Sequence, residues 1–481
     1  MSQFTRRQFL NRLGVAGAGL AAMLAGCQPK VVEVTRVVEK QVEKVVEKTV
    51  VVKEAVEVAK EVTRVVEKQV QAPQPTKGPV NLAIWSMGPL NPDAAAWKDY
   101  QVTFKKILAD KVPGATYTFK DMGWDEVLRQ NMVTGLLGGT APDVIVGESF
   151  IQPYARIGAY LQLDDGLTDI KKNLIPGTYA NAVADGKIYG ISQYTGVFAF
   201  ESNPNVVKQA GLDPNEWPKT WSQLLERCAA ITKAGKDKFY GYTLQGPVGF
   251  LVGGIMRYNV FANLAGVTLC KDDCQAPFFD DPKLEPVLAF IRELNRYTPP
   301  GLTFNPNEGQ VYSQLHEGIS AYQIGAPWHM QWAIEAKIED VIQYGPLPKP
   351  DQGGKDVSRT VGNPLVMVLS GSKFPRESIE FIKITQMDEI TDYVYVATNG
   401  RSPSTYSGLQ RTLPKIKPQH KIFFEILQTA AVGAMPQWTK ATDKVWTTFN
   451  EMMQKLLTTE DPIAPLQQAA QAAAEAAYKA G

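Results

Sequence analysis

The spacing of apolar residues from residue 80 onward predicts strands that alternate with helices. Short apolar runs are separated by longer stretches in which apolar residues recur every three or four positions. The first five segments are strands at 80–85, 115–120 and 143–147 and helices at 94–111 and 125–137. This order predicts an α/β fold in which right-handed crossovers join parallel strands and ligands bind at the carboxyl ends of the strands.

The first 26 residues have the pattern of an export signal. A twin arginine at 6–7 precedes an apolar, Gly/Ala-rich run at 13–25. A membrane-spanning helix needs about 20 apolar residues, more than this run provides. The run ends in Leu-Ala-Gly-Cys at 24–27, which resembles the bacterial lipobox. The resemblance implies that residues 1–26 are removed and that Cys27 carries lipid. We therefore expect an exported protein held at the outer face of the cytoplasmic membrane, at the cell surface or in a periplasm.

Residues 31–70 form a repeat that is rich in valine and charge. They contain 17 Val, 8 Glu and 8 Lys or Arg, without Gly or Pro, and the segment 34–42 recurs identically at 62–70. Val or Ala recurs at every seventh position, and Val or Thr recurs four residues after each of these. This is the pattern of the a and d positions that form the seam of a coiled coil. The poor helix propensity of valine equally favours an extended spacer. In either form residues 27–79, with a Pro-rich linker at 71–79, are expected to lift a domain from the membrane. A coiled coil would also let this stalk self-associate.

The balance of charge argues against nucleic acid as the main partner. The chain has 50 Lys and Arg against 49 Asp and Glu, and the signal holds three basic and no acidic residues, which leaves 47 against 49. Nucleic-acid binding needs an excess of Lys and Arg on one face. The three histidines show no metal-ligand spacing, and no serine stands in a G-x-S-x-G motif. We expect no metal, no cofactor and no catalytic site, although two carboxylates would suffice for a glycosidase.

The cysteines after Cys27 have two expected roles. Cys270 and Cys274 are spaced to close a small disulfide loop, which an oxidising compartment would favour. A zinc site is the alternative, but no histidine lies nearby in the sequence. Cys228 is expected to be a buried apolar thiol.

Five short segments follow one another in the chain after residue 137. They are Gly-Gly-Thr-Ala-Pro-Asp-Val-Ile at 138–145, Asp-Gly-Lys-Ile-Tyr-Gly-Ile at 185–191, Ala-Gly-Leu and then Trp-Pro-Lys-Thr-Trp within 210–221, Gly-Ile-Ser-Ala-Tyr-Gln-Ile-Gly-Ala-Pro-Trp at 318–328 and Asn-Gly-Arg-Ser-Pro at 399–403. In this order they resemble the extracellular solute-binding proteins of ABC transporters, in the sugar-binding group that includes maltose-binding protein. The resemblance extends from residue 80 to the C-terminus.

This resemblance implies a periplasmic-binding-protein fold, with two α/β lobes and a ligand cleft between them. We expect the first lobe at 80–192 plus 364–408 and the second lobe at 194–362 plus 409–481. By the same resemblance, the partners would be two permease subunits in the membrane and a cytoplasmic ATPase.

A sugar site needs aromatic planes for the apolar ring faces and fixed polar groups for the hydroxyls. The resemblance places Trp328 at the position of a stacking tryptophan and Gln245 in a loop that lines the cleft. Trp85 and Trp438 are further candidates for stacking, and core packing is the alternative role for each tryptophan. The remaining polar candidates follow strand ends, crossovers and a late turn; they are Ser86, Glu148, Ser149, Gln193, Tyr194, Thr195, Asn363 and Arg401. A solvated loop or strand-cap role is the alternative for each of these.

The expected function is the substrate-binding component of an ABC importer, which closes two lobes on a mono- or oligosaccharide and delivers it to a permease. A surface carbohydrate-active enzyme and an adhesion or sensor lipoprotein are the alternatives. Glycerol phosphate would require a basic cleft, for which Arg401 is the obvious residue, and a polyamine would require paired acids, of which Glu148 is the single one seen. A neutral saccharide therefore fits the sequence best.

Overall fold

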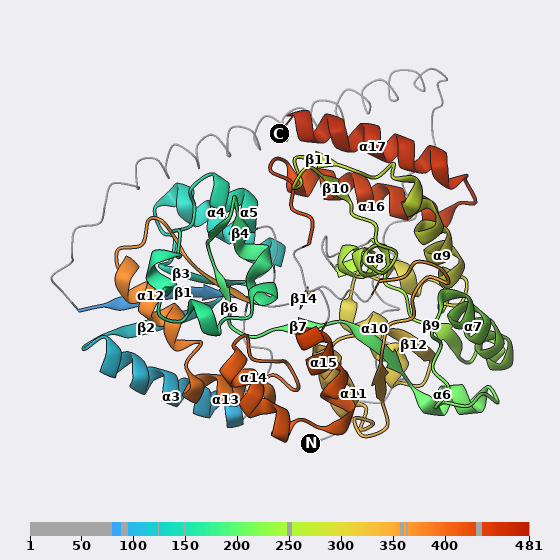
Figure 1. The fold of residues 1–481 in the computed structure, drawn as a ribbon, viewed down its shortest axis with the longest axis horizontal. Coiled ribbons are helices and arrows are strands. Elements are labelled where there is room, and N and C mark those ends of the chain that lie inside the picture. The colour runs from blue at the N-terminus through green and yellow to red at the C-terminus, as the bar shows by residue number, and fades with distance from the viewer. Residues whose placement is uncertain are drawn as a thin grey trace, which may run out of the picture. The chain divides into compact units, whose positions relative to one another are not determined.

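The computed structural model describes most of the chain after residue 78. The described residues are 79–87, 95–123, 125–147, 151–247, 253–355, 360–361, 364–429 and 435–480. The export signal, the repeat stalk and four predicted functional residues, Cys27, Glu148, Ser149 and Asn363, lie outside them. Two main sheets, each with its own hydrophobic core, organise the described part (Figure 1).

The first lobe is built on a five-stranded sheet in the order β2-β1-β3-β15-β6. Strand β1 pairs in parallel with β2 and β3, whereas β15 is antiparallel to both β3 and β6. The strands are β1 Asn81–Ser86, β2 Thr116–Asp121, β3 Val144–Gly147, β6 Ile191–Ser192 and β15 Leu365–Val368. The parallel pairing of the first three strands confirms the predicted α/β fold.

Helices cover both faces of this sheet. The buried residues of α3, including Tyr100 and Phe104, recur at helical spacing, and Phe104 packs against Phe381 of α12 with ring centroids 4.7 Å apart. On the opposite face, Gly135 of α4 lies against the ring of Trp85. The helices are α3 Ala95–Lys111, α4 Asp125–Gly138, α5 Ile151–Arg156, α12 Pro375–Ile384, α13 Asp388–Ala397 and α14 Tyr406–Thr412.

Asp143, immediately before β3, links two separate segments of the first lobe by hydrogen bonds. Its carboxylate accepts from the backbone N of Ala83 at 2.9 Å, from the hydroxyl of Ser372 at 2.7 Å and from the backbone N of Lys373 at 3.2 Å. Asp143 therefore joins β1 to the loop between β15 and α12. The aspartate of the Pro-Asp segment that helps to define the family resemblance has a structural role here.

The second lobe is built on a four-stranded sheet in the order β13-β8-β12-β9. Strand β8 is antiparallel to β12 and β13, and β12 is parallel to β9. The strands are β8 Ala199–Ser202, β9 Tyr240–Tyr242, β12 Ser320–Gly325 and β13 Gln343–Gly345. All of β8 and β12 is buried, so a charged residue in either strand must be paired within the protein.

The helices of the second lobe enclose its core. Trp221 at the start of α7 stacks on Phe290 of α9 with centroids 4.2 Å apart, and the Thr220 hydroxyl caps α7 by accepting from the backbone N of Gln223. The helices are α6 Pro204–Gln209, α7 Trp221–Gly235, α8 Gly253–Leu264, α9 Glu285–Asn295, α10 Glu308–His316, α11 Met330–Glu335, α15 Lys421–Thr429, α16 Thr442–Thr458 and α17 Ile463–Ala480.

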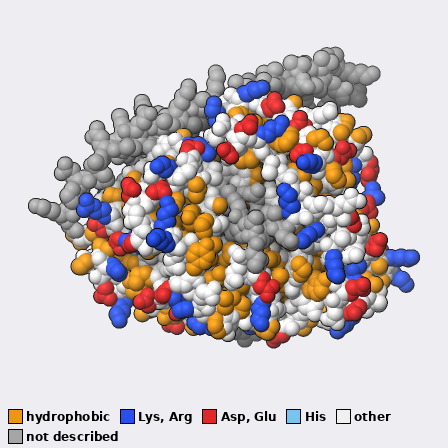
Figure 2. Space-filling model, viewed as in Figure 1, with side chains coloured by type: hydrophobic (Ala, Val, Ile, Leu, Met, Phe, Trp, Pro, Cys, Tyr) orange, Lys and Arg blue, Asp and Glu red, His pale blue; other side chains and the backbone are white. Residues whose placement is uncertain are grey.

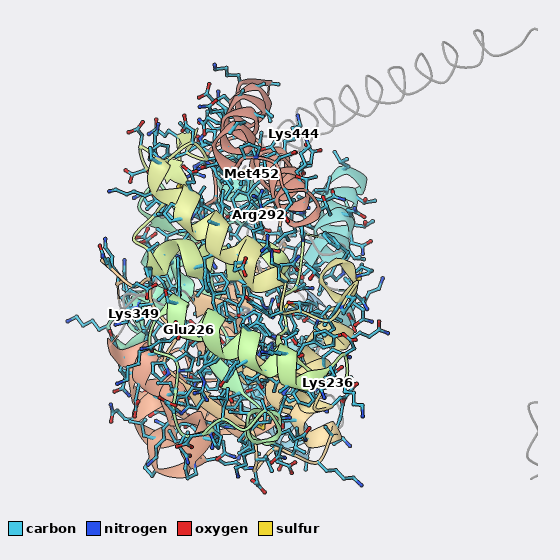
Figure 3. The ribbon with its side chains drawn as sticks, turned by 90° about the vertical axis from the view of Figure 1, so that its right-hand side faces the viewer. Glu226, Lys236, Arg292, Lys349, Lys444 and Met452 are labelled. Atoms are coloured by element: carbon cyan, nitrogen blue, oxygen red, sulfur yellow. A yellow bond between two sulfur atoms is a disulfide. The ribbon has the colours of Figure 1, made fainter. Side chains whose placement is uncertain are left out.

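The C-terminal helices α16 and α17 run side by side and complete this lobe (Figure 1). Arg292 of α9 lies close to Met452 of α16 (Figure 3) and donates from Nε to the carbonyl of Leu456 at 3.0 Å. Cys270 and Cys274 form a disulfide across the turn that joins the short strands β10 Cys270–Lys271 and β11 Ala276–Pro277.

The chain crosses between the two sheets more than once. It passes from β6 through β7 Gly196–Val197 to β8, and it returns from β13 through β14 Thr360–Val361 to β15. Strands β7 and β14 pair antiparallel, so the two crossings support each other. The remaining short strands, β4 Val183–Ala184 and β5 Lys187–Ile188, form a hairpin before β6. The residue limits predicted for the two lobes stay a prediction.

Candidate ligand-binding site

Three predicted site residues from distant segments meet at the crossings. The guanidinium of Arg401 lies 5.3 Å from the ring centroid of Tyr194 and 5.0 Å from that of Trp328. Tyr194 precedes β7, Trp328 follows β12, and Arg401 follows α13. Arg401 and Tyr194 are only 3% and 2% exposed, whereas Trp328 is half-buried. A guanidinium held between two aromatic faces is a favourable cation–π arrangement, and it fixes the rings relative to each other.

A tight turn and a backbone exchange position Arg401. The turn places Asn399 and Gly400 at positive φ, +53° and +116°, a conformation that glycine adopts most easily. Beyond the turn, Thr195 and Ser402 exchange backbone hydrogen bonds of 2.8 Å in both directions. Thr195, another predicted site residue, therefore acts through its backbone in tying the Arg401 loop to the first crossing.

The indole of Trp328 lies directly on that crossing. A Cβ built on Gly196 would stand 3.1 Å from Cζ3 of Trp328 and 3.3 Å from Cδ of Pro327. Behind it, Phe198 meets the indole with centroids 5.7 Å apart. The close approach favours glycine at 196, because a methyl group there would require the indole to shift, and it makes the backbone of β7 one wall of the site.

A buried carboxylate lies at the centre of a polar network beneath Trp328. Glu201 of β8 is fully buried and accepts four hydrogen bonds. They come from Nε2 of His316 (2.9 Å), Nδ1 of His329 (2.7 Å), Nε2 of Gln323 (2.7 Å) and the hydroxyl of Tyr344 (3.1 Å). Burial favours the protonated acid, but the adjacent histidine rings and their hydrogen bonds hold the pKa of Glu201 well below its ordinary value.

Arg257 of α8 extends this network toward Gln245. Its guanidinium stacks on Tyr312 at 3.9 Å and pairs with Glu308 at 2.7 Å. Burial opposes ionisation of Glu308, but this guanidinium holds the pKa of Glu308 below its ordinary value. Arg257 also faces Nε2 of His329 at 3.4 Å. Because a guanidinium only donates, Nε2 of His329 accepts and its proton resides on Nδ1, which donates to Glu201.

Gln245 is buried against the same arginine. Its Oε1 accepts from Arg257 at 3.4 Å, and its carbonyl accepts from the hydroxyl of Tyr258 at 2.7 Å. The Nε2 of Gln245 has no hydrogen-bond partner in the described part of the chain. Arg257 in turn lies 5.4 Å from the ring centroid of Phe198, which contacts Trp328. Gln245 therefore joins the Trp328 cluster through Arg257 and Phe198.

The other predicted residues lie apart from this cluster. Ser86 is buried at the end of β1 and lines a cavity of the first lobe together with Gln193 and Tyr194. Trp85 is half-buried between Gly135 and Lys120, whose Nζ is 6.0 Å from its ring centroid.

Trp438 lies in the core of the second lobe. It has no exposed surface and meets Phe279 and Trp446 edge to face, at 5.8 and 4.9 Å. A ring enclosed in this way cannot stack on a ligand in this conformation, so the structure favours core packing over the predicted ligand contact. Cys228, buried and without a disulfide, also packs in this core, and burial raises the pKa of its thiol.

Sequence reasoning missed the Glu201 network. An acid within the apolar strand Ala-Phe-Glu-Ser at 199–202 was the available signal, because a charge in a buried strand needs a partner. Two of the three histidines of the chain supply it, from positions 115 and 128 residues away. Spacing along the sequence could not have identified these partners.

The structure also bears on metals, membranes and nucleic acid. In the described ranges, no group of three or more His, Cys, Asp or Glu residues is placed to hold a metal ion. The helices within those ranges include none that is both long and apolar enough to cross a bilayer. On the face seen in Figure 2, acidic and basic side chains are interspersed rather than segregated, which is unlike the basic face that nucleic-acid binding requires.

Comparisons with known proteins agree with this architecture. The family model of bacterial extracellular solute-binding proteins matches residues 94–384. A probable amino-acid ABC transporter periplasmic-binding protein of Sinorhizobium fredii is 26% identical over 191 residues, which cover 37% of this chain and 42% of that protein. The chain thus matches less than half the length of this relative.

Several solved structures share the fold. A solute-binding protein of Thermotoga lettingae bound with α-D-tagatose has a TM-score of 0.70 at 20% identity, over 83% of this chain and 100% of that one. The cyclic α-maltosyl-1,6-maltose binding protein from Arthrobacter globiformis has a TM-score of 0.68 at 19% identity, over 84% and 100%. A sugar-binding protein of Xanthomonas citri gives 0.68 at 15% identity, over 83% and 98%. These likenesses confirm the two-lobed fold, and because the family model matches more than half of the sequence, the chain belongs to the bacterial extracellular solute-binding proteins.

Proposed function

We propose that this solute-binding protein captures a mono- or oligosaccharide between its lobes and delivers it to the permease of an ABC importer. The observation that carries the proposal is the placement of Trp328. Its half-buried indole rests on the backbone at Gly196 and beside the guanidinium of Arg401, where the chain crosses between the lobes. A fixed aromatic plane next to buried polar groups is what the apolar face and hydroxyl rim of a sugar require.

Lobe closure would couple binding to transport. A ligand that touches both lobes binds the closed form better, and it shifts the population toward that form by its difference in affinity. Tyr194 belongs to the first crossing, and the loop that carries Arg401 is hydrogen-bonded to that crossing through Thr195 and Ser402, so a ligand against them would act where the lobes rotate. The permease would then recognise the closed form.

The described residues give little support to an enzyme. Glu201 is the most deeply buried carboxylate of the cluster, and four donors within the protein already occupy both of its oxygens. A catalytic acid or base needs access to the substrate. The similar proteins named above are described as binding proteins, which also favours capture over hydrolysis.

A thermal-shift screen of the full chain tests the ligand class. The panel holds mono- and oligosaccharides, glycerol phosphate, polyamines and, because of the name of the Sinorhizobium relative, amino acids. A ligand at about 100 times its dissociation constant adds about 2.7 kcal/mol of stability. We expect a rise of several degrees with one saccharide class. A rise with a polyamine, glycerol phosphate or amino acid alone would keep the solute-binding function and overturn the sugar.

We also propose that the protein is exported through its twin-arginine signal and anchored by lipid on Cys27. The support is the sequence 24–27, which ends an apolar run, and the membership of an extracellular family. Expression of the full chain and of Cys27→Ser in a bacterial host tests the anchor. We expect the parent protein in the membrane fraction with an acylated N-terminal cysteine by mass spectrometry, and the variant in the soluble fraction. An unmodified Cys27 in the membrane-associated protein would contradict the anchor.

A further inference from the structure

A cavity of about 270 Å³ lies inside the first lobe, between α3 and the sheet. Its walls come from α3, the ends of β1 and β3, strands β2 and β15, and α12, all of which belong to the first lobe. Tyr194 lines it as well, and the same ring faces Arg401. The cavity therefore adjoins the cluster around Trp328, but apart from Gln193, Tyr194 and Pro364 at the crossings, its described lining comes from the first lobe.

Aromatic rings form the main wall of this cavity. Trp97 and Tyr100 are stacked with centroids 4.7 Å apart and planes inclined by 18°, and Tyr100 and Phe104 continue the stack at 5.9 Å and 17°. The three residues lie on one side of α3, since they follow one another at intervals of three and four. Tyr117 and Phe119 of β2 also line the cavity. Such a wall suits a flat aromatic ring better than an aliphatic chain, because ring pairs gain from stacked and edge-to-face contacts.

Two polar groups of the α3 wall can donate to a ligand. Trp97 is 7% exposed, and its Nε1–H, which can only donate, has no acceptor among the described residues. The hydroxyl oxygen of Tyr100 accepts from Nε2 of Gln193 at 2.7 Å, which leaves the hydroxyl proton to be donated. Burial raises the pKa of Tyr100, so this proton is retained.

The charge around the cavity has one sign. Lys105 is the one charged residue among the described residues that line it, and no carboxylate does. The Nζ of Lys105 stands 5.9 Å from the ring centroid of Tyr117. A ligand that carries acceptors and a negative charge would satisfy the unpaired donor, and it would meet no carboxylate among the described lining residues.

We propose that this cavity is a second binding site, separate from the cleft between the lobes, for a small aromatic carboxylate. The ring of the ligand lies against the stacked wall of α3, and its carboxylate accepts from Nε1 of Trp97, while Lys105, about two helical turns further along α3, adds positive charge to the lining. The proposal does not depend on the sugar, since the residues that carry it are those of α3 and β2.

Calorimetric titration of the full chain with benzoate, and with benzyl alcohol as the matched neutral probe, tests the site. We expect benzoate to bind at least tenfold more tightly than benzyl alcohol. Trp97→Phe keeps an aromatic ring and removes the donor, so it should weaken benzoate binding about tenfold, as expected for a hydrogen bond to a charged group, without changing that of benzyl alcohol. Trp217→Phe, the same substitution in the second lobe, should change neither.

Two further variants keep the test decisive. Lys105→Gln alters an exposed residue, so it should fold even where Trp97→Phe does not, and it should weaken benzoate alone. Trp328→Leu should leave benzoate binding unchanged. No binding of benzoate at millimolar concentration, equal affinity for the two probes, full affinity in both Trp97→Phe and Lys105→Gln, or loss of benzoate binding in Trp328→Leu would each overturn the proposal.

Discussion

Replacement of Glu201 by Gln tests the buried network beneath Trp328. The substitution keeps the shape of the side chain but exchanges one acceptor oxygen for an NH₂ donor. One oxygen of Glu201 accepts from His329 and Gln323, and the other accepts from His316 and Tyr344. If the amide nitrogen takes the place of the oxygen that faces His329 and Gln323, two buried donors face a donor. If it takes the place of the other oxygen, the Tyr344 hydroxyl can accept from it, but His316 must move its proton to Nδ1, which has no hydrogen-bond partner among the described residues. His329 cannot escape by moving its proton to Nε2, because that atom faces the guanidinium of Arg257.

The magnitude follows from the less costly of these two arrangements. It leaves one buried donor, Nδ1–H of His316, without an acceptor at a cost of about 1–3 kcal/mol, so Glu201→Gln should lower the free energy of unfolding by at least about 1–3 kcal/mol. For a unit of 150–250 residues, each kcal/mol lowers the transition temperature by about 2–4 °C, so we expect a fall of at least about 2 °C. Ligand binding should also weaken, because His329 follows Trp328 directly in the chain.

Urea unfolding and calorimetry of the full chain measure both effects. Glu226→Gln is the matched control, because Glu226 lies exposed on α7 (Figure 3) and the same chemical change there should alter stability by less than about 0.5 kcal/mol. If Glu201→Gln unfolds within experimental error of this control, the carboxylate is not the buried acceptor of four hydrogen bonds, and the reasoning is refuted.

Three further predictions concern residues around the crossings. Burial, together with Lys417, lowers the pKa of His420 to about 4. The folded state therefore favours the neutral ring. The contribution of His420 to the free energy of unfolding is fully present above about pH 6.5, the pKa of histidine in the unfolded chain, and up to about 3 kcal/mol of it is lost as the pH falls toward 4. Urea unfolding at pH 7.5 and 4.5 should show a larger loss in the parent than in His420→Gln, because the other groups whose pKa is lowered respond alike in both proteins; an equal loss in both would contradict it. Gly196→Ala places a methyl group 3.1 Å from the indole of Trp328, so we expect about tenfold weaker ligand binding by calorimetry with little change in unfolding; unchanged affinity would show that the indole need not shift. Arg401→Lys keeps the charge but loses the planar stack, and chemical denaturation should show a loss of about 1–2 kcal/mol; parent-like stability would mean that the stack contributes nothing.

The sequence predicted the first lobe more fully than the second. Strands expected at 80–85, 115–120 and 143–147 are observed at Asn81–Ser86, Thr116–Asp121 and Val144–Gly147. Local patterns sufficed there because each parallel strand is a buried apolar run followed by a helix. In the second lobe, the central strand β8 contains Glu201, and its stability depends on residues that lie far away in the sequence.

The candidate site was predicted by position and not by contact. The sequence predicts Tyr194, Thr195 and Arg401 because they lie at crossovers and turns, and the structure brings them together with Trp328. The stacking of Arg401 between two rings depends on segments that are far apart in the sequence, so no local pattern could reveal it. Trp438 is predicted as a ligand contact but packs in the core. The sequence around a tryptophan does not show whether its ring lies in a core or in a cleft.

The central claim is that the lobes hold a saccharide against Trp328. The most direct test is calorimetric titration of the full chain and of two variants with the saccharide that gives the largest thermal shift. Trp328→Leu removes the proposed stacking plane, and Trp217→Leu makes the same change at another half-buried tryptophan of the second lobe, which packs on Gly345. We predict that Trp328→Leu weakens binding at least tenfold and that Trp217→Leu binds as the parent does. Equal affinity in all three proteins would contradict the account.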